Sequence, residues 1–184
     1  MSEDRQLVQD CLAGNTEAQQ EFVRRFQSSV FGLCLRMLAH RQDAEDVAQE
    51  TFTRAFRHLA RWDALRPLRP WLLAIAANRC RTHLAAQRQH EFPVEFMDDP
   101  AELNRATPRL DLAEELQLAI NRLREEYRLC FVLFYLNEMN LSEVAEITGN
   151  PTGTVKTWLR RARQELADHL QRRSIVPMLF QGEP

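Results

Sequence analysis

The sequence predicts an all-α fold, with two small helical domains joined by a flexible acidic linker. Apolar residues recur at the helical period in successive segments, and the 184-residue chain has only five glycines. Between the periodic segments lies a stretch with three prolines, six acids, two arginines and no sustained period, which is typical of a linker. We therefore expect a first domain at 1–90, a linker at 91–111, a second domain at 112–173 and a tail at 174–184.

Charge is sorted along the chain, although the net charge is only -2. Residues 151–173 carry six Lys/Arg and two Asp/Glu, whereas the linker has a local charge of -4. Apolar and charged fractions of 45% and 27% are ordinary for a soluble globular protein. The local charge of these segments, rather than the net charge of the chain, indicates a nucleic-acid-binding protein.

The cysteine spacing argues against a zinc site or a disulfide framework, and the N-terminal sequence argues against a signal peptide. The four cysteines lie far apart, with no CxxC and no nearby paired histidines, so we expect buried free thiols at Cys11, Cys34, Cys80 and Cys130. The N-terminus is acidic and lacks a signal-peptide core, and no apolar run is long enough to span a bilayer. We expect a cytoplasmic protein without membrane insertion, and no metal or other cofactor.

Four helices are predicted in the first domain. Their apolar stripes give approximate bounds of 3–13, 17–39, 43–59 and 69–89. Asp43 is a good N-cap residue for the third helix. Pro67 and Pro70 interrupt the chain, so residues 61–69 are expected to form a loop.

The third helix has an acidic outer face. Its first turns read DAEDVAQE and place four carboxylates within eight residues. Such a cluster is either a solvated N-terminal turn or a docking surface for a basic partner. A metal-dependent enzyme built on this face is a further alternative, but no histidine or second acidic cluster follows at ligand-like spacing.

The next segment combines basic and aromatic residues. From Arg66 to His90 there are five arginines and no acid, and Trp62 and Trp71 lie beside this run. Exposed bases stack on aromatic rings while phosphates pair with arginine, so the segment suits single-stranded nucleic acid. For each tryptophan individually, a place in the core is the simpler alternative.

The second domain ends in a helix-turn-helix pattern at residues 141–166. Thr107 and Pro108 can start its first helix, and another helix is expected at 125–136. Asn140 and Ser142 are rival caps for the following short helix, and Gly149 suits the left-handed position after its end.

The last helix has an apolar stripe and a basic outer face. The stripe comprises Val155, Leu159, Ala162 and Leu166. Lys156 and Arg160 lie off the stripe and can reach phosphates and guanine edges in a major groove. A merely solvated helix face is the alternative.

Three stretches, in this order, resemble the bacterial RNA polymerase sigma factors of the sigma-70 family, specifically the extracytoplasmic-function group. They are DAEDVAQETFTRAFRHLARWD (43–63), RPWLLAIAANRCRTHL (69–84) and LSEVAEITGNPTGTVKTWLRRARQEL (141–166). The resemblance implies a non-enzymatic protein that directs core RNA polymerase to promoters. The first domain would be region two, which docks on the β′ clamp helices and recognises and melts the minus-ten element. The second would be region four, which reads the minus-thirty-five element and contacts the β flap.

Matched residue by residue, the resemblance implies three sets of contacts. Core polymerase would be bound by Asp43, Glu45, Asp46, Gln49 and Glu50. Minus-ten DNA would be bound by Trp62, Asp63, Trp71, Asn78, Arg79 and Arg81. Minus-thirty-five DNA would be bound by Thr152, Thr154, Lys156, Thr157, Arg160, Arg161 and Arg163.

The sequence departs from the family pattern at two places. The loop after the third helix reads DALRPLRP, where relatives are often rich in Gly, Ser and Phe, so the pocket for a flipped minus-ten base is not defined by the match. Trp158 stands where many relatives carry Arg, and we expect it to pack inside its domain.

Partners follow from the resemblance. Core RNA polymerase and promoter DNA are implied, and an anti-sigma factor is expected. A conventional helix-turn-helix regulator is the alternative function, but it explains residues 141–166 and leaves the basic, aromatic run at 61–90 without a role.

Overall fold

The computed structural model describes residues 3–90 and 112–172. The expected linker, the Thr107–Pro108 helix start and the tail therefore lie outside the described residues. Every regular element in the two described ranges is helical, in agreement with the predicted fold class. None of these helices is long and apolar enough to cross a membrane.

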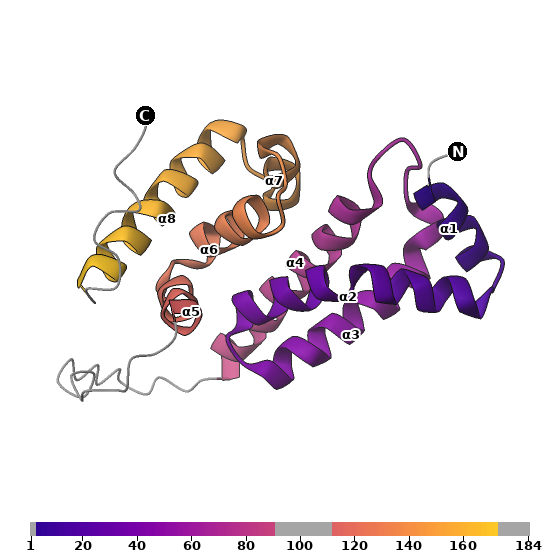
Figure 1. Cartoon of the computed structure of the whole chain (residues 1–184), viewed down its shortest axis with the longest axis horizontal. Helices are drawn as coiled ribbons and strands as arrows, with labels where there is room; N and C mark the ends of the chain where they lie inside the picture. Colours follow the sequence, from indigo (N-terminus) through magenta and orange to yellow (C-terminus); the bar gives the residue numbers. More distant parts are fainter. Residues whose placement is uncertain (1–2, 91–111, 173–184) are drawn as a thin grey trace.

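The first range folds into a helical bundle. It contains α1 (Glu3–Leu12), α2 (Thr16–Leu38), α3 (Arg41–His58), the 3₁₀ turn η1 (Leu59–Arg61) and α4 (Leu68–His90). Helices α2, α3 and α4 pack against one another, and α1 packs on α2 (Figure 1). The bounds agree with the predicted helices to within about two residues, which is the usual uncertainty of helix ends.

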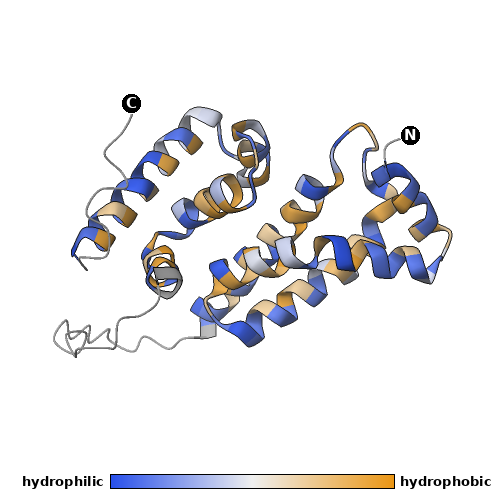
Figure 2. Ribbon diagram, in the orientation of Figure 1, coloured by the Kyte–Doolittle hydropathy of each residue, from blue (hydrophilic) through white to orange (hydrophobic). Residues whose placement is uncertain are grey.

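The apolar stripes face inward in this bundle (Figure 2). Phe22, Leu33 and Met37 of α2 are fully buried, and Leu72 of α4 is nearly so. Helix α4 is buried over a wide face, because Leu73, Ala77 and Cys80 are buried as well as Leu72. The face is wide because α2 and α3 both pack against it.

The start of α3 corrects one prediction. Asp43 is not the N-cap, because the helix begins at Arg41 and His40 occupies the cap position in extended backbone. The His40 Nδ1 atom accepts a hydrogen bond from the Asp43 backbone N–H at 3.4 Å. Asp43 instead lies in the first turn, where a carboxylate favours the positive end of the helix dipole.

The second range contains a smaller set of helices. They are α5 (Leu112–Arg122), α6 (Glu125–Phe131), the π-helical turn η3 (Val132–Leu136), α7 (Leu141–Thr148) and α8 (Thr152–Arg172). Helix α8 packs on α5, α6 and α7. The predicted single helix at 125–136 is thus an α-helix that widens into one π turn.

A capping box starts α7 and a left-handed glycine ends it. The Asn140 side chain accepts from the backbone N–H groups of Ser142 and Glu143, and the Glu143 carboxylate accepts from the Asn140 N–H at 2.9 Å. Asn140 is therefore the cap, in preference to Ser142. Gly149 has φ 69° and ψ 27°, as its predicted position after the helix end requires.

All four cysteines are free and buried, as predicted. Burial raises the pKa of the Cys130 thiol to about 12. The Cys34 thiol and burial together raise the pKa of Cys80 far above its usual value. These thiols are therefore core side chains.

Candidate polymerase and nucleic-acid interfaces

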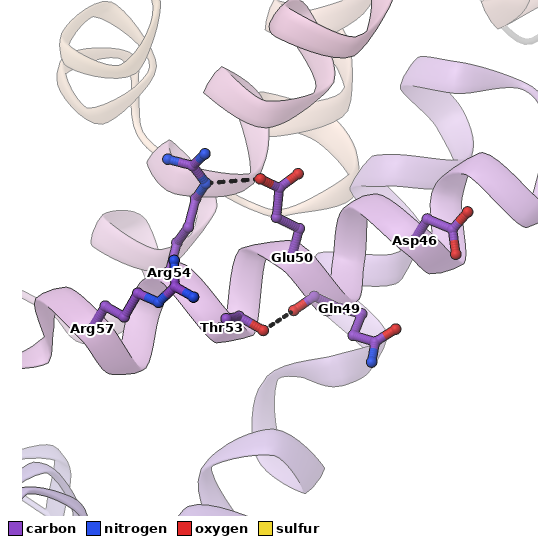
Figure 3. Close-up of a pocket in the computed structure, with 6 residues that line it drawn as sticks. All are labelled: Asp46, Gln49, Glu50, Thr53, Arg54 and Arg57. Carbon is purple, nitrogen blue, oxygen red and sulfur yellow. Dashed lines mark hydrogen bonds and ion pairs between the residues drawn. The ribbon is translucent and has the colours of Figure 1, made fainter.

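The acidic face of α3 is only partly free to bind a partner. Glu45 and Asp46 are exposed, but Glu45 pairs with Arg41 at 2.9 Å. Asp46 makes no ion pair with the rest of the described chain. In Figure 3 Asp46 points away from Glu50, which is turned toward Arg54. Asp46 is thus the carboxylate of this face that is most available to a basic partner.

Glu50 is bound within the domain. Its carboxylate lies 3.0 Å from Arg54 Nε and 2.7 Å from Arg79 Nη2. Burial alone would raise the pKa of Glu50, but hydrogen bonds and charges from the two arginines outweigh it and hold the pKa below its ordinary value. A shallow cavity of about 350 Å³ lies over this region, lined by Asp46, Gln49, Glu50, Thr53, Arg54 and Arg57 (Figure 3).

Asp43 is held by groups from both α3 and α4. Its carboxylate lies 3.4 Å from His83 Nε2, and it accepts from Gln87 Nε2 at 3.0 Å. Burial raises the pKa of Asp43, whereas His83, His40 and Gln87 lower it by a larger combined amount. Asp43 therefore ties α3 to α4.

An apolar groove beside the acidic face was missed from the sequence. It encloses about 520 Å³ between α2 and α3, where Phe31, Phe52 and Phe56 are half-buried and line its floor with Val23. The helical period places Phe52 and Phe56 on the apolar stripe of α3, but periodicity cannot show that α2 leaves part of that stripe open. Gln49 and Glu45 line both the groove and the acidic face.

The loop between η1 and α4 is held in a defined turn. The Asp63 carboxylate accepts from the Leu65 N–H at 2.9 Å, and the Asp63 carbonyl accepts from the Arg66 N–H at 2.9 Å. Arg5 of α1 donates to the Ala64 carbonyl at 2.9 Å. The turn leaves the Leu65 side chain 85% exposed at its tip.

The two tryptophans beside the loop form one wall of a cavity. Trp62 is only 9% exposed and Trp71 is half-buried. Together with Pro67 and Pro70 they line a cavity of about 440 Å³, which Ile147 of α7 also lines. The core interpretation thus holds for most of the Trp62 ring, while one part of it remains at a cavity surface.

Helix α4 separates the three polar residues that the sequence grouped together. Asn78 is exposed and accepts from Arg81 Nη2 at 2.5 Å, so these two share one surface. Arg79 projects toward α3 and binds Glu50. Neighbouring residues on a helix differ by about 100° in direction, which explains the division.

The last helix presents a basic outer face, as predicted. Its exposed members from the predicted set are Thr152, Lys156, Thr157, Arg160, Arg161 and Arg163, and Thr154 is half-buried. Arg161 Nη1 donates to the Tyr127 hydroxyl at 2.9 Å. Thr157 donates its hydroxyl to the Gly153 carbonyl at 3.0 Å. Lys156, Arg160 and Arg163 bind no other described side chain.

Trp158 packs inside the domain, as expected. Its ring is half-buried, and its centroid lies 6.4 Å from that of Tyr127. The same tyrosine therefore positions both Trp158 and Arg161 on α8.

Comparison with known proteins agrees with this arrangement. The model of Sigma-70 region 2 matches residues 22–90, and that of Sigma-70, region 4 matches residues 113–166. The extracytoplasmic-function sigma factor SigW of Bacillus subtilis is 32% identical over 171 residues, covering 86% of this chain and 91% of SigW. The sigma-H factor of Pseudomonas aeruginosa is 28% identical over 182 residues, covering 92% and 94% of the two chains.

Solved structures share the fold. CnrH, solved with the cytosolic domain of CnrY, has a TM-score of 0.70 at 24% identity and covers 93% of this chain and 99% of its own. The sigma factor RpoE of Bartonella quintana, solved with the anti-sigma factor NepR, has a TM-score of 0.66 at 19% identity, covering 83% and 98%. A conventional helix-turn-helix regulator does not account for the match to region two. The chain belongs to the sigma-70 family of RNA polymerase sigma factors, in its extracytoplasmic-function group.

Proposed function

We propose that this sigma factor binds core RNA polymerase through its N-terminal domain and reads the two promoter elements with separate surfaces. The observation that carries the proposal is that one chain presents three chemically different surfaces. An acidic face with an apolar groove, a loop with two tryptophans and a basic helix-turn-helix face follow in this order. Recognising and melting promoter DNA require correctly positioned side chains, and they require no catalytic group in this chain.

Asp46 and Gln49 are proposed to make the direct polymerase contacts, with Glu45 beside them. All three are exposed on α3, and Glu45 and Gln49 also border the apolar groove. Charge complementarity with a basic partner would fix the register, while the groove would supply buried apolar area. Asp43 and Glu50 are proposed to support this surface indirectly, because both are bound to α4.

The minus-ten strand is proposed to run along the loop and the outer face of α4. Asn78 and Arg81 are available on that face, and Trp62 and Trp71 provide aromatic surface beside it. Stacking of a base on an aromatic ring contributes about 1–3 kcal/mol, which is comparable with the cost of unstacking it. Asp63 is proposed to hold the loop in its turn, and Arg79 to hold α4 against α3.

The minus-thirty-five element is proposed to be read by α8 in the major groove. Lys156 and Arg160 are the proposed base or phosphate contacts, with Arg163 on the flank and Thr152, Thr154 and Thr157 near the helix start. Arg161 is proposed to position the helix through Tyr127. A single good bidentate contact discriminates between bases by about 1–3 kcal/mol.

Other partners are proposed by analogy. CnrH was solved with the cytosolic domain of CnrY and the Bartonella protein with the anti-sigma factor NepR, and an anti-sigma factor is proposed for this chain as well. The β flap is proposed as the polymerase contact of the C-terminal domain. A sigma factor acts where the polymerase and the chromosome are, so a cytoplasmic location is proposed.

Reconstitution with core polymerase tests the assignment. The full chain and core enzyme should give run-off transcripts from a cognate promoter that core enzyme alone does not give. Asp46→Arg should weaken core binding by about tenfold or more, because it places a like charge at the interface. Glu3→Arg, the same charge change at an exposed site on α1, is the control. If the two variants bind core polymerase with equal affinity, the assignment of Asp46 to the polymerase interface is wrong.

A further inference from the structure

Helix α1 lies outside the part of the chain that the family match describes. The match to Sigma-70 region 2 begins at residue 22, whereas α1 ends at Leu12. A helix of 10 residues is marginal in water by itself, so packing must hold α1 in place. Val8 and Cys11 are buried, and α1 contacts both α2 and η1 (Figure 1). The helix is thus a fixed part of the bundle, although the match assigns no role to it.

Both ends of α1 are tied to α2. At its start, Asp4 Oδ1 lies 3.1 Å from Arg25 Nη2 of α2. At its end, Gly14 turns the chain with φ 81°, and the Asn15 N–H donates to the Asp10 carbonyl at 3.1 Å. Asn15 also caps α2, so the turn between the two helices has one defined shape. The direction of α1 across the bundle is therefore set by α2.

The Arg5 side chain extends this fixed position to the loop after η1. Its Nε donates to the Ala64 carbonyl at 2.9 Å, across 59 residues of sequence. The other hydrogen bonds of the loop backbone are local, because Asp63 accepts from the N–H groups of Leu65 and Arg66. Within residues 3–90 and 112–172, no other hydrogen bond joins the backbone of residues 63–67 to a different helix. Asp63 therefore gives the turn its shape, and Arg5 sets its position on the bundle.

The position of this loop matters because the loop is proposed to receive the melted strand. The turn places Leu65 at its tip, and Pro67 lines the cavity beside Trp62. A loop that is ordered before binding loses less conformational entropy when the strand binds, so it binds more tightly and more selectively. The side-chain pair of Arg66 with Glu146 adds little, since the two are 62% and 64% exposed. The hydrogen bond from α1 is therefore the main polar link between the tip of the loop and a rigid helix.

We propose that α1 positions the strand-binding loop through Arg5, and that this helix thereby affects minus-ten melting and selectivity without touching the bases. The idea rests on the proposed function of the loop. Arg5 is a positioning residue, because its Nε donor is used within the protein. Its loss should alter strand opening and the choice of minus-ten bases, and it should leave core binding and minus-thirty-five binding unchanged.

The mobility of a spin label on the loop measures the positioning directly. The native cysteines are buried, so a label attaches selectively to Leu65→Cys in the full chain. Arg5→Met removes the donor and should make the label more mobile, which narrows its resonance lines. Arg5→Lys keeps a charged donor and should restore part of the immobilisation. Arg24→Met, which removes the same charge from an exposed site on α2, is the control.

Asp4→Asn separates positioning from charge. It loosens the tie between α1 and α2, leaves Arg5 in place and removes a negative charge. If Arg5 bound a DNA phosphate directly, Asp4→Asn would strengthen strand binding. Positioning predicts the opposite result, which is a change in the same direction as that of Arg5→Met, but smaller, in both label mobility and strand opening.

Strand opening is measured with 2-aminopurine in the minus-ten element of a promoter that is bound by core polymerase and the unlabelled chain. Arg5→Met should lower the opening rate by about threefold to tenfold and weaken the preference among promoters with substituted minus-ten bases. Arg5→Lys should recover part of both. Unchanged label mobility in Arg5→Met would overturn the proposal. A more mobile label with wild-type opening and selectivity would overturn its consequence for DNA.

Run-off transcription distinguishes a failure of this inference from a failure of the proposed function. If Arg5→Met frees the loop but the wild-type chain gives no promoter-dependent transcripts with core enzyme, the contact stands and the function assigned to the loop is wrong. If the wild-type chain supports transcription and Arg5→Met leaves the loop immobile, only the inference is wrong. Circular dichroism melts of each variant show whether the bundle is folded, so that a mobile loop is not mistaken for an unfolded domain.

Discussion

Glu50 of α3 and Arg79 of α4 form an ion pair of 2.7 Å, although the family match assigns them to two different binding surfaces. Arg54 binds the same carboxylate from the following turn of α3. The pair links the helix that carries the proposed polymerase face to the helix that carries the proposed strand face. The ion pair therefore holds the two surfaces in position relative to each other, although the sequence suggests that one residue binds polymerase and the other binds DNA.

The Glu50 contacts predict a pH-dependent stability. The pKa of Glu50 is lowered from about 4.5, so its contribution is present above that pH and is lost as the pH falls through the lower, folded-state pKa. The carboxylate is 39% exposed, and solvent screening limits the contribution at neutral pH to about 0.2–1 kcal/mol. Urea unfolding should show Glu50→Gln to be less stable than wild type at pH 7, with the difference shrinking as the pH falls below about 4.5. A difference that persists undiminished at low pH would contradict the ion-pair account.

Arg160 and Arg161 should behave differently although they are neighbours on α8. Arg160→Ala should weaken binding of the reconstituted polymerase to promoter duplex by about 1–3 kcal/mol and relax preference within the minus-thirty-five element. Arg161→Ala should act mainly on the stability of the domain, because Arg161 binds Tyr127. Tyr127→Phe is the matched control for that contact. If Arg161→Ala relaxes sequence preference while Tyr127→Phe does not, Arg161 reads DNA directly.

Two glycines in the helix-turn-helix should respond to alanine with opposite signs. Gly149→Ala should destabilise the protein by about 1 kcal/mol, because φ is +69° there and a side chain is strained in that conformation. Gly153 lies in α8 with nothing within 4 Å of an added Cβ. Gly153→Ala should therefore stabilise by up to about 1 kcal/mol through helix propensity. Urea denaturation of the full chain measures both, and equal signs would contradict the assignment of the turn.

The cap of α7 gives a second matched pair. Asn140→Ala should cost about 1 kcal/mol, because it removes the side-chain acceptor of the capping box. Ser142→Ala should have an effect within about 0.5 kcal/mol, since Ser142 is exposed and its backbone N–H is the donor to Asn140. Thermal melts followed by circular dichroism would test the pair. A larger loss for Ser142→Ala would reinstate it as the cap.

The helices and the turn of the helix-turn-helix could be predicted from local sequence. Apolar period, proline positions and Gly149 are local signals, since each depends on residues within a turn or two of one another. The outward direction of Lys156 and Arg160 followed from the same period. The predicted N-cap of α3 was wrong because histidine has no strong preference for the N-cap position, whereas aspartate, as at Asp43, does.

Which charged residues are free to bind a partner depends on how the helices pack. Glu50 and Asp43 of α3 bind residues of α4, Arg79 of α4 binds α3, and Arg161 of α8 binds α6. These partners are distant in sequence, so no local pattern could show them. The open part of the Phe52 and Phe56 stripe depends on how α2 lies against α3. The contact of Arg69 with Asn137 depends on the packing of one domain against the other. Periodicity fixes the direction in which a side chain leaves its own helix, but its partner is set by the packing of the other helices.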